Sequence, residues 1–323
     1  MPVKFLINPF AREQGGGRLW TVLSDACARL GYVAGKDYHL EWTRAEDTSE
    51  QARQAADAWD RVVAVGGDGT VRAVAEGLLK AGTGAALGVI PQGTGNDFAR
   101  VMGLHQLWTR RRRFGVETVV ERLATGPTTR VDVLAANDRL YFVSYCGIGW
   151  DALVCRSYTR LRRHPAFRMV IRGRLLNECA YALLALRFGM RRLPELRLRL
   201  HTPEAGWVST VTPAGASAVL VSNVASYAGG VPLVPDALHH DGLFELTTVP
   251  RPHVFALLIL SRYWPRLRRL CPLETRRVSG VRLSLPGTGA LQADGDDATD
   301  AVAGETCLTV AVAGAISAVY APS

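Results

Sequence analysis

The sequence predicts an α/β domain followed by a β-rich domain, and a change of pattern along the chain carries this prediction. Over residues 1–127, apolar strands alternate with helical segments, which is the order of a doubly wound, mostly parallel sheet. Over residues 128–323, short strands of alternating character predominate and indicate an antiparallel β-sandwich with peripheral helices. Gly126-Pro127 marks the boundary, and we leave open that the last strands pack back on the first domain.

In the first domain the elements alternate in chain order. Val3 to Ile7 is an apolar strand that Asn8-Pro9 ends, and apolar residues at helical spacing then lead to a helix stop at Gly31. Val62 to Val65 is apolar throughout, as expected of a strand covered on both faces. The predicted strands are residues 3–7, 38–42, 62–65 and 87–90. The predicted helices are residues 19–30, 48–58 and 71–80.

The second domain is expected to consist mainly of strands in which apolar and polar residues alternate. These strands are residues 131–134, 140–143, 218–221, 244–249, 281–285 and 308–312. Two helical stretches interrupt them, residues 167–188 and 254–263, and the second stops before Pro265.

The composition is that of a globular protein. Hydrophobic residues make up 48% and charged residues 21% of the 323 residues, so a core can be buried, and disorder and coiled coil are excluded. No apolar run approaches the roughly 18 residues that cross a bilayer, and the first strand begins at Val3, so we expect a soluble, cytoplasmic protein. The six cysteines form no CxxC pair and are expected to be reduced thiols.

The net charge of +9 is concentrated in one segment. Between Arg156 and Arg199 the sequence has twelve arginines and two glutamates, and smaller arginine clusters occupy residues 110–113 and surround Tyr263-Trp264. A concentrated basic surface indicates an anionic partner, either a nucleic acid or an anionic membrane. Bulky apolar residues alternate with the arginines, which is typical of a helix at a lipid interface and equally of a helix packed on a core.

Gly66-Gly67-Asp68-Gly69-Thr70 follows a buried strand and opens a helix. Glycines let backbone N–H groups approach an anion, and a helix N-terminus adds its positive end, so this turn is typical of phosphate binding. A carboxylate inside such a turn would repel a phosphate on its own. Asp68 is therefore a candidate for holding Mg²⁺ or for polarising an attacking hydroxyl.

The next strand ends in a second turn of the same kind, Pro91-Gln92-Gly93-Thr94-Gly95-Asn96-Asp97. In open α/β sheets a ligand binds beyond the carboxyl ends of the strands. Two glycine-rich turns on consecutive strands can therefore face one polyphosphate, and each contributes one aspartate.

Together, GGDGT and PQGTGNDFAR resemble the diacylglycerol kinase catalytic family, which includes bacterial soluble lipid kinases and the sphingosine and ceramide kinases. Three later segments match the family in order and spacing. They are Cys146-Gly147-Ile148-Gly149-Trp150-Asp151-Ala152, Val234-Pro235-Asp236-Ala237 with Asp241-Gly242-Leu243-Phe244, and Asp294-Gly295-Asp296. The resemblance implies an NAD-kinase-like nucleotide-binding domain joined to a β-sandwich domain, with the active site between them.

The resemblance also implies an activity, the ATP- and Mg²⁺-dependent transfer of the γ-phosphate to a lipid hydroxyl. Diacylglycerol is the default acceptor and phosphatidic acid the product. Asp68 and Asp97 would form an acidic pair close to the transferred phosphate, and Asp132 is a third member of that network. The residues that would bind ATP are Asn8, Pro9, Thr43, Gly66, Gly67, Asp68, Gly69, Thr70, Gly93, Thr94 and Asn96.

The catalytic residues that the resemblance implies are Asp68, Asp97, Asp294 and Asp296. Asp296 stands where the family has a glutamate that acts as general base, and neighbouring Asp297 is a second candidate for this role. A separate Mg²⁺ site would use the carboxylate of Asp241 and the backbone carbonyls of Leu238 and Leu243.

A lipid substrate stays mostly in its bilayer, which predicts how the protein meets it. We expect peripheral association with the inner face of the membrane through the arginine-rich residues 156–199, and no binding of nucleic acid. A homodimer is left open.

Departures from the family pattern keep alternatives open. After GGDGT the family usually continues with Leu-Asn-Glu, whereas this chain has Val71-Arg72-Ala73. A catalytically weak homologue that binds lipid or nucleotide is therefore one alternative. NAD kinase, which shares the GGDG turn, is less favoured because PQGTGNDFAR and the Asp241-Gly242 loop belong to the lipid-kinase pattern.

Overall fold

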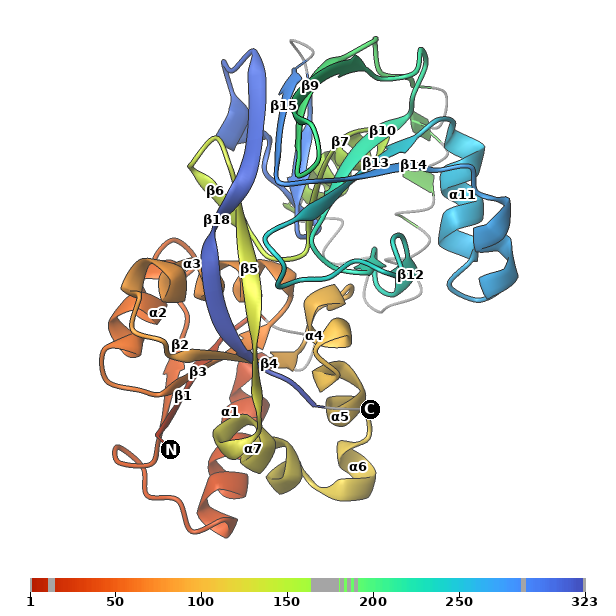
Figure 1. Ribbon diagram of the computed structural model, residues 1–323. Coiled ribbons are helices and arrows are strands. Elements are labelled where there is room, and N and C mark those ends of the chain that lie inside the picture. The colour runs from red at the N-terminus through yellow and green to blue at the C-terminus, as the bar shows by residue number, and fades with distance from the viewer. Residues whose placement is uncertain are drawn as a thin grey trace. The chain divides into compact units, whose positions relative to one another are not determined.

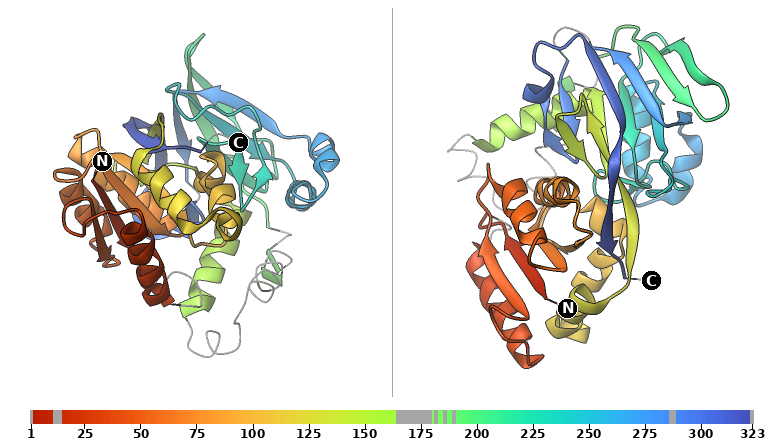
Figure 2. Two further views of the ribbon diagram at one scale, coloured as in Figure 1. Left: turned by 90° about the horizontal axis from the view of Figure 1, so that it is seen from below. Right: turned by 60° about the vertical axis from the view of Figure 1, so that its left-hand side comes forward.

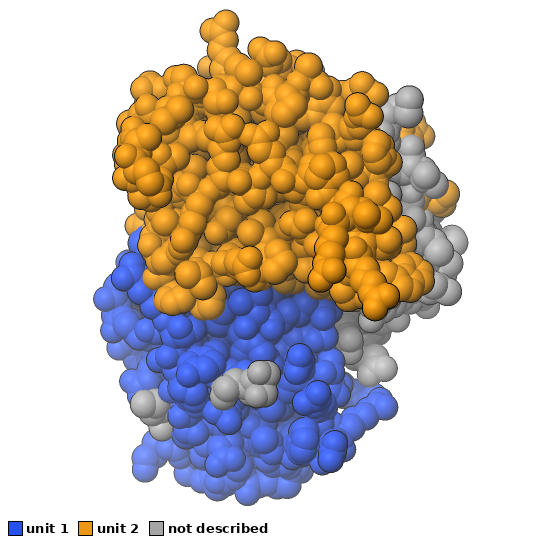
Figure 3. Space-filling model, turned by 45° about the vertical axis from the view of Figure 1, so that its right-hand side comes forward, with its two compact units in different colours: residues 1–133, 314–323 blue, residues 134–313 orange. Residues whose placement is uncertain are grey.

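The computed structural model describes residues 2–10, 15–163, 180, 183–184, 187–188, 191–285 and 289–321. The chain divides into two compact units, coloured separately in Figure 3: unit 1 comprises residues 1–133 and 314–323, and unit 2 comprises residues 134–313. The division falls inside β5 (Thr128–Ala136) and β18 (Cys307–Val319), so each of these strands contributes to both units.

Unit 1 is built on a parallel sheet with the strand order β2-β1-β3-β4 (Figure 1). The strands are β1 (Val3–Ile7), β2 (Tyr38–Trp42), β3 (Arg61–Gly66) and β4 (Ala86–Pro91). They coincide with the four predicted strands, and β3 and β4 are buried along their whole length, which explains their apolar sequences. The end of β18 extends the sheet, because Ser317 and Ala318 pair in parallel with Ala86 and Leu87.

Helices cover both faces of this sheet because right-handed crossovers fix the side on which each helix lies. In the strand order, the connection from β1 to β2 leads toward one edge of the sheet, whereas the connections from β2 to β3 and from β3 to β4 lead toward the other edge. Therefore α1 (Gly15–Arg29) lies on one face, and α2 (Thr48–Ala56) and α3 (Asp68–Ala81) lie on the other (Figure 1). Unit 1 is thus the doubly wound α/β unit that the sequence predicts. The remaining helices are α4 (Asp97–Val101), α5 (Leu104–Thr109), α6 (Arg111–Phe114) and α7 (Val116–Thr125).

The segment that follows β18 is bound to unit 1 by backbone hydrogen bonds. Tyr320 N–H donates to Pro127 O (3.1 Å), and Ala321 N–H donates to Met102 O (2.8 Å). Gly103 has a φ of 73°, and a β-carbon at this position would collide with the carbonyl oxygen of Ala321. The chain therefore passes closely over the turn between α4 and α5 only because residue 103 is a glycine.

Unit 2 contains two mainly antiparallel sheets whose facing sides share one apolar core, so the predicted β-rich domain is confirmed. In one sheet β18, β15, β8 and β9 are neighbours, and β5 pairs with β6; the other has the order β14-β13-β10-β7-β16-β17. Leu198 and Leu200 of the first sheet share the core with Val219, Val221 and Leu246 of the second. The strand bounds are β6 (Leu140–Phe142), β7 (Tyr145–Gly149), β8 (Arg197–Thr202), β9 (Gly206–Val211), β10 (Ala218–Ser222), β13 (Phe244–Val249), β14 (Glu274–Val278), β15 (Gly280–Ser284), β16 (Leu291–Ala293) and β17 (Asp296–Asp297).

A second apolar cluster covers the opposite face of the six-stranded sheet. It packs α8 (Trp150–Arg163), α11 (Pro252–Leu260) and the hairpin of β11 (Ser226–Tyr227) and β12 (Val231–Pro232) against residues of β7, β10 and β13. Trp150 meets Phe255 edge to face at 4.5 Å between ring centroids. Two short 3-10 helices, η1 (Pro265–Leu270) and η2 (Thr299–Val302), complete the unit.

Three expectations concern residues that the structure describes only in part. Within the described ranges, no helix has the length and apolar character needed to cross a membrane. Most of the predicted helix at residues 167–188 lies outside these ranges. The cysteines that fall inside them are free: Cys27, Cys146, Cys155, Cys271 and Cys307.

Candidate active site

The predicted nucleotide-binding residues of unit 1 lie at one edge of its parallel sheet. Asn8 follows the end of β1, and Thr43 follows the end of β2. Ile7 pairs with both Trp42 and Val65, so the carboxyl ends of three strands are level. Gly66 pairs with Pro91, which brings the two glycine-rich turns side by side at the same edge.

Hydrogen bonds join these strand ends. Asn8 Nδ2 donates to Thr70 Oγ1 (3.1 Å), which links the end of β1 to the first turn of α3. Thr43 N–H donates to Ile7 O (2.9 Å), and both threonines are 8% exposed. Thr70 packs so closely on Gly66 that a β-carbon there would overlap the threonine hydroxyl. The first glycine of GGDGT is therefore required by packing.

The two glycine turns are in direct backbone contact. A β-carbon on Gly93 would lie 2.6 Å from Gly67 Cα, so both positions exclude side chains. Asn96, which has a φ of 56°, shapes the second turn: its Oδ1 accepts from Gly93 N–H (2.8 Å) and its Nδ2 donates to Gly93 O (2.7 Å). Thr94 in the same turn is exposed, and Pro9 after β1 is half-buried.

Asp68 holds the second turn against the first. Its Oδ2 accepts from Asn96 N–H (2.7 Å), and its Oδ1 accepts from Asp97 N–H (3.1 Å). Asp68 is the first residue of α3, where the helix dipole stabilises a carboxylate and where the Gly67 cap provides no side-chain hydrogen bond. Asp68, whose charge alone would repel a phosphate, thus has a structural role in joining the two turns.

Asp68 and Asp97 come together around Gly95. A β-carbon on Gly95 would lie 2.8 Å from Asp68 Oδ2 and 3.3 Å from Asp97 Oδ2. Two adjacent carboxylates fit Mg²⁺, which takes one or two protein carboxylates and completes its shell with water and phosphate oxygens. Within the described ranges, no three Asp, Glu, His or Cys side chains form a metal-binding group, so Asp132 is not placed as a third ligand.

In unit 2, the sequence Asp294-Gly295 forms the tight turn between β16 and β17. Both residues have positive φ, 48° and 81°, and Ala293 pairs with Asp296 across the turn. Asp-Gly is a preferred sequence for two-residue hairpin loops because both positions of a type I′ turn need positive φ. The hairpin therefore presents Asp296 directly after its turn.

Asp294, predicted as catalytic, is a buried anchor in this structure. It is 2% exposed, and its carboxylate accepts hydrogen bonds from three consecutive backbone N–H groups. They belong to Val143 (3.1 Å), Ser144 (2.9 Å) and Tyr145 (3.0 Å). Asp294 thus ties the hairpin to the start of β7 and holds the turn that precedes Asp296.

We predict that Asp294→Ala destabilises the fold. Three N–H groups would lose their acceptor, and each buried unsatisfied donor costs about 1–3 kcal/mol. The free energy of unfolding, measured in urea, should fall by about 3 kcal/mol or more. Asp300→Ala is the matched control because Asp300 is an exposed aspartate of η2 nearby in the sequence. A loss for Asp294→Ala no larger than that of the control would show that the anchor is unimportant.

Two side chains that sequence reasoning did not single out also fix the turn. Gln292 Oε1 accepts from Gly295 N–H (3.1 Å), and the Cys155 thiol donates to Gly295 O (3.1 Å). Burial raises the pKa of Cys155, so the thiol stays protonated and keeps its role as donor. No motif marks these residues, because a glutamine and a cysteine are individually unremarkable in sequence.

The two candidate bases differ in their surroundings. Asp297 Oδ1 accepts from the Thr299 hydroxyl (2.6 Å) and from Thr299 N–H (3.2 Å), so this carboxylate stabilises the start of η2. Asp296 is exposed on the hairpin. The geometry therefore favours Asp296 as the carboxylate that a substrate can reach.

Asp151 of the GxGxDA-like segment is a buried acid beside the same hairpin. Burial raises its pKa from 3.8 to about 7, although Tyr227 Oη (3.2 Å) and Gln292 Nε2 (3.3 Å) donate to its Oδ2. A β-carbon on Gly147 would lie 2.7 Å from Asp151 Oδ2, so the glycine of the motif makes room for the acid. The other carboxylate oxygen, Asp151 Oδ1, has no hydrogen-bond partner among the described residues.

The raised pKa of Asp151 predicts a pH dependence of stability. Between pH 4 and pH 7 the folded chain retains this proton, whereas the unfolded chain has lost it, so stability falls as pH rises. The slope is at most about 1.4 kcal/mol per pH unit, the value for one proton. Asp151→Asn should flatten this fall in urea unfolding curves recorded at pH 4, 5.5 and 7. An unchanged slope would mean that Asp151 does not titrate in this range.

The predicted second Mg²⁺ site is arranged differently from its expected donor set. Asp241 Oδ1 accepts from Leu243 N–H (3.0 Å), and Arg277 forms an ion pair with Asp241 Oδ2. A guanidinium thus already neutralises the one carboxylate of the set, and Leu238 is 45% exposed. As arranged, these residues do not fit a cation, and the site of Leu238, Asp241 and Leu243 stays a prediction.

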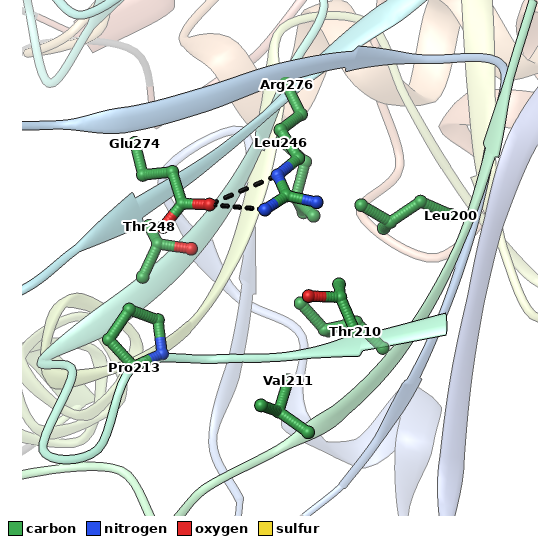
Figure 4. A pocket seen from close by; sticks show the side chains of 9 residues that line it. Leu200, Thr210, Val211, Pro213, Leu246, Thr248, Glu274 and Arg276 are labelled. Carbon is green, nitrogen blue, oxygen red and sulfur yellow. Dashed lines mark hydrogen bonds and ion pairs between the residues drawn. The ribbon is translucent and has the colours of Figure 1, made fainter. Parts of the chain in front are cut away.

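Two hollows in the described residues lie apart from these groups. The first, of about 10 Å³, is bordered in unit 2 by Leu200, Leu246 and the hydrogen-bonded Glu274–Arg276 pair (Figure 4), and it has room for at most one water. The second, of about 640 Å³, lies at the amino ends of β3 and β4, the edge of the sheet opposite to the glycine turns. Neither hollow contains a predicted site residue.

Comparison with known families covers most of the chain. A profile of the diacylglycerol kinase catalytic domain matches residues 2–136, and a profile of the diacylglycerol kinase accessory domain matches residues 141–255. The first match contains both glycine turns. The second contains Asp151 and the Asp241 loop, and the Asp294 hairpin lies beyond it.

Individual relatives agree with the profiles. A diacylglycerol kinase of Mycobacterium tuberculosis is 32% identical over 305 residues, which cover 91% of this chain and 88% of the relative. A diacylglycerol kinase of Bacillus subtilis is 29% identical over 213 residues, covering 66% of this chain and 62% of the relative. A crystal structure of a diacylglycerol kinase from Bacillus anthracis superposes with a TM-score of 0.67 at 20% identity, over 99% of this chain and 97% of that one.

Proposed function

Because the chain belongs to the diacylglycerol kinase family and is a lipid kinase, we propose that it uses ATP and Mg²⁺ to phosphorylate diacylglycerol to phosphatidic acid. The observation that carries the proposal is the contact between two glycine turns through Asp68, which accepts from the backbone of Asn96 and Asp97. This contact places two carboxylates and an open helix N-terminus at one edge of the sheet.

Unit 1 supplies groups that can bind a nucleoside triphosphate. The backbone N–H groups at the start of α3 would bind phosphate oxygens, and Asn8 and Thr70 line the same edge. Asp68 and Asp97 would hold Mg²⁺, which neutralises phosphate charge when bound. Gly67, Gly93 and Gly95 keep the approach free of side chains.

Asp296 would act as the general base. Its carboxylate takes the proton of the lipid hydroxyl as the hydroxyl oxygen attacks the γ-phosphorus, and the bond from that phosphorus to the bridging oxygen of ADP breaks. The products are the phosphorylated lipid and ADP, and the proton then passes to solvent. The rigid Asp294-Gly295 turn fixes where this carboxylate stands.

Transfer to a lipid extract tests the proposal. The purified chain, Mg²⁺ and ATP labelled at the γ-phosphate should convert diacylglycerol in mixed micelles to labelled phosphatidic acid, identified by mass. Label in another lipid would correct the acceptor and keep the kinase activity. Binding of ATP without transfer to any lipid would support the catalytically weak homologue, which Arg72 and Ala73 motivate. Labelled NADP from NAD would support NAD kinase.

A further inference from the structure

One end of α11 exposes large apolar side chains. We define the α11 tip as residues 260–270, which comprise the last residue of α11, the turn after it and η1. Figure 2 (left) shows this part of unit 2, in light blue, at the margin of the unit and beyond its strands. Its exposed side chains are Leu260 (42%), Tyr263 (60%), Trp264 (61%) and Leu270 (64%). Four large exposed apolar side chains within eleven residues make this segment a candidate interaction surface.

The α11 tip is held by specific contacts. Arg268 donates from Nε to Pro232 O (3.0 Å) and from Nη2 to Leu233 O (2.8 Å), which ties η1 to β12. The Cys271 thiol directly after η1 is 6% exposed and donates to Leu267 O (3.4 Å). The exposure of the aromatic and leucine side chains is therefore a property of a folded surface.

Along the chain, the stretch that contains the tip carries charge of one sign. Residues 246–273 include five arginines and no aspartate or glutamate. Of the acids on either side, Glu245 is buried and Glu274 pairs with Arg276. Because Arg268 is bound to backbone carbonyls, the outward charge comes from Arg262, Arg266 and Arg269. Arg262 lies over the Tyr263 ring at 5.6 Å.

We propose that the α11 tip docks this protein on an anionic lipid bilayer. Tryptophan and tyrosine favour the membrane interface, leucines enter the acyl region, and arginines bind anionic headgroups from the same depth. A nucleic acid would bind the arginines and stack on the rings, but Leu260 and Leu270 would stay in water. The inference rests on the proposed function, because a diacylglycerol acceptor resides in a bilayer.

The inference assigns docking to one of the smaller arginine clusters noted in the sequence, the one around Tyr263-Trp264, and not to residues 156–199. The predicted membrane surface, residues 156–199, lies mostly outside the described ranges. The α11 tip is a different segment of the chain, and the proposal does not depend on residues 156–199.

Vesicle flotation tests the proposal with the full chain. Vesicles with 30% phosphatidylglycerol in phosphatidylcholine should bind the protein at low salt, and pure phosphatidylcholine vesicles should bind it much less. Arg262→Gln/Arg266→Gln/Arg269→Gln should weaken binding to the anionic vesicles by about 10²-fold, since each arginine near the surface contributes about fivefold. Tyr263→Ser/Trp264→Ser should weaken it by roughly tenfold or more.

Unit 2 offers a matched control. Trp207 is 44% exposed and lies between Arg199 (5.6 Å) and Arg282 (5.2 Å), so it is another aromatic side chain flanked by arginines. Trp207→Ser should bind vesicles like the unaltered protein. Equal losses in Trp207→Ser and Tyr263→Ser/Trp264→Ser, or no loss in the latter, would overturn the assignment. The assignment would also be overturned if the tip variants lost retention on a random DNA duplex but kept vesicle binding.

Quenching of tryptophan fluorescence distinguishes insertion of the α11 tip into the bilayer from adsorption of the protein on its surface. Brominated lipids quench tryptophan fluorescence at close range, so quenching should diminish in Trp264→Phe and persist in Trp207→Phe. Quenching that is the same in both variants would contradict insertion of the tip.

A soluble substrate separates this inference from the proposed function. Tyr263→Ser/Trp264→Ser should phosphorylate short-chain diacylglycerol in free solution at the normal rate and long-chain diacylglycerol in anionic vesicles at a rate at least tenfold lower. If neither substrate is phosphorylated by the unaltered protein, the proposed function fails while vesicle binding still tests the tip. If the variant loses both reactions equally, the tip acts in the kinase reaction itself and the docking role is overturned.

Discussion

Replacing Asp296 by asparagine is expected to lower kcat for lipid phosphorylation by about 10²- to 10⁴-fold, the usual contribution of a general base. Asp296 is exposed and follows a turn that other side chains hold, so we expect its replacement to disturb the fold little. The free energy of unfolding should therefore change by less than ~0.5 kcal/mol. Steady-state kinetics with γ-labelled ATP, together with urea unfolding, measure both quantities.

Two controls make this result specific to Asp296. Asp297→Asn disturbs the contact with Thr299 and should lower kcat by less than tenfold. Asp296→Glu restores the family's residue and should remain within tenfold of the unaltered rate. If Asp297→Asn is the inactive variant and Asp296→Asn retains full activity, the base has been misassigned.

Replacing Asp68 by alanine is expected to lower kcat/KM for ATP by about 10²-fold or more. The substitution removes one carboxylate of the acidic pair and also releases the backbone of Asn96 and Asp97, and misplacing a catalytic group by 1 Å can already cost 10²-fold. The turn of residues 93–97 would lose its link to α3. The measurement is the ATP dependence of transfer to a saturating lipid substrate.

Asp68→Asn separates the two roles of this side chain. Asparagine keeps an oxygen that accepts one of the two N–H groups, but it lacks the charge that attracts Mg²⁺. If charge is the larger contribution, Asp68→Asn should be almost as inactive as Asp68→Ala, and raising the Mg²⁺ concentration should partly restore its rate. Near-normal activity of Asp68→Asn would show that Asp68 acts only by holding the second turn.

Much of the fold was predictable because it depends on local patterns. The strands of unit 1 are apolar throughout, and their right-handed connections place the helices, so periodicity was enough to predict a doubly wound unit. The sequence contained no comparable signal for the division inside β5 and β18. Whether a strand continues from one unit into another depends on pairing partners far apart in the chain, which periodicity does not identify.

The candidate site was predictable in its residues and less so in their roles. The glycine turns were identifiable because a carboxylate among glycines at a strand end is unexpected in a turn that only binds phosphate. The double role of Asp68 was not, because its partners lie 28 and 29 residues away. Asp294 looked like a catalytic acid since it precedes Gly295-Asp296. Its burial against three N–H groups appears only once β7 and β16 are paired.

The surroundings of Asp241 were also not predictable from the sequence. Its loop matched a metal-binding pattern of the family, but Arg277 on β14 forms an ion pair with its carboxylate. A residue 36 positions later in the chain has no sequence relation to the loop, so only the antiparallel pairing of β13 with β14 reveals the neutralising charge.

The return of residues 314–321 to unit 1 determines the order in which this protein can be assembled at the ribosome. The residues of the glycine turns are synthesised before unit 2, yet the strand that pairs with β4 and the backbone that bonds to Met102 and Pro127 are synthesised after it. Unit 2 has emerged completely before unit 1 receives its final strand. A nascent chain therefore waits for residues 314–321 before unit 1 is complete, and a fragment ending at residue 133 would lack that strand.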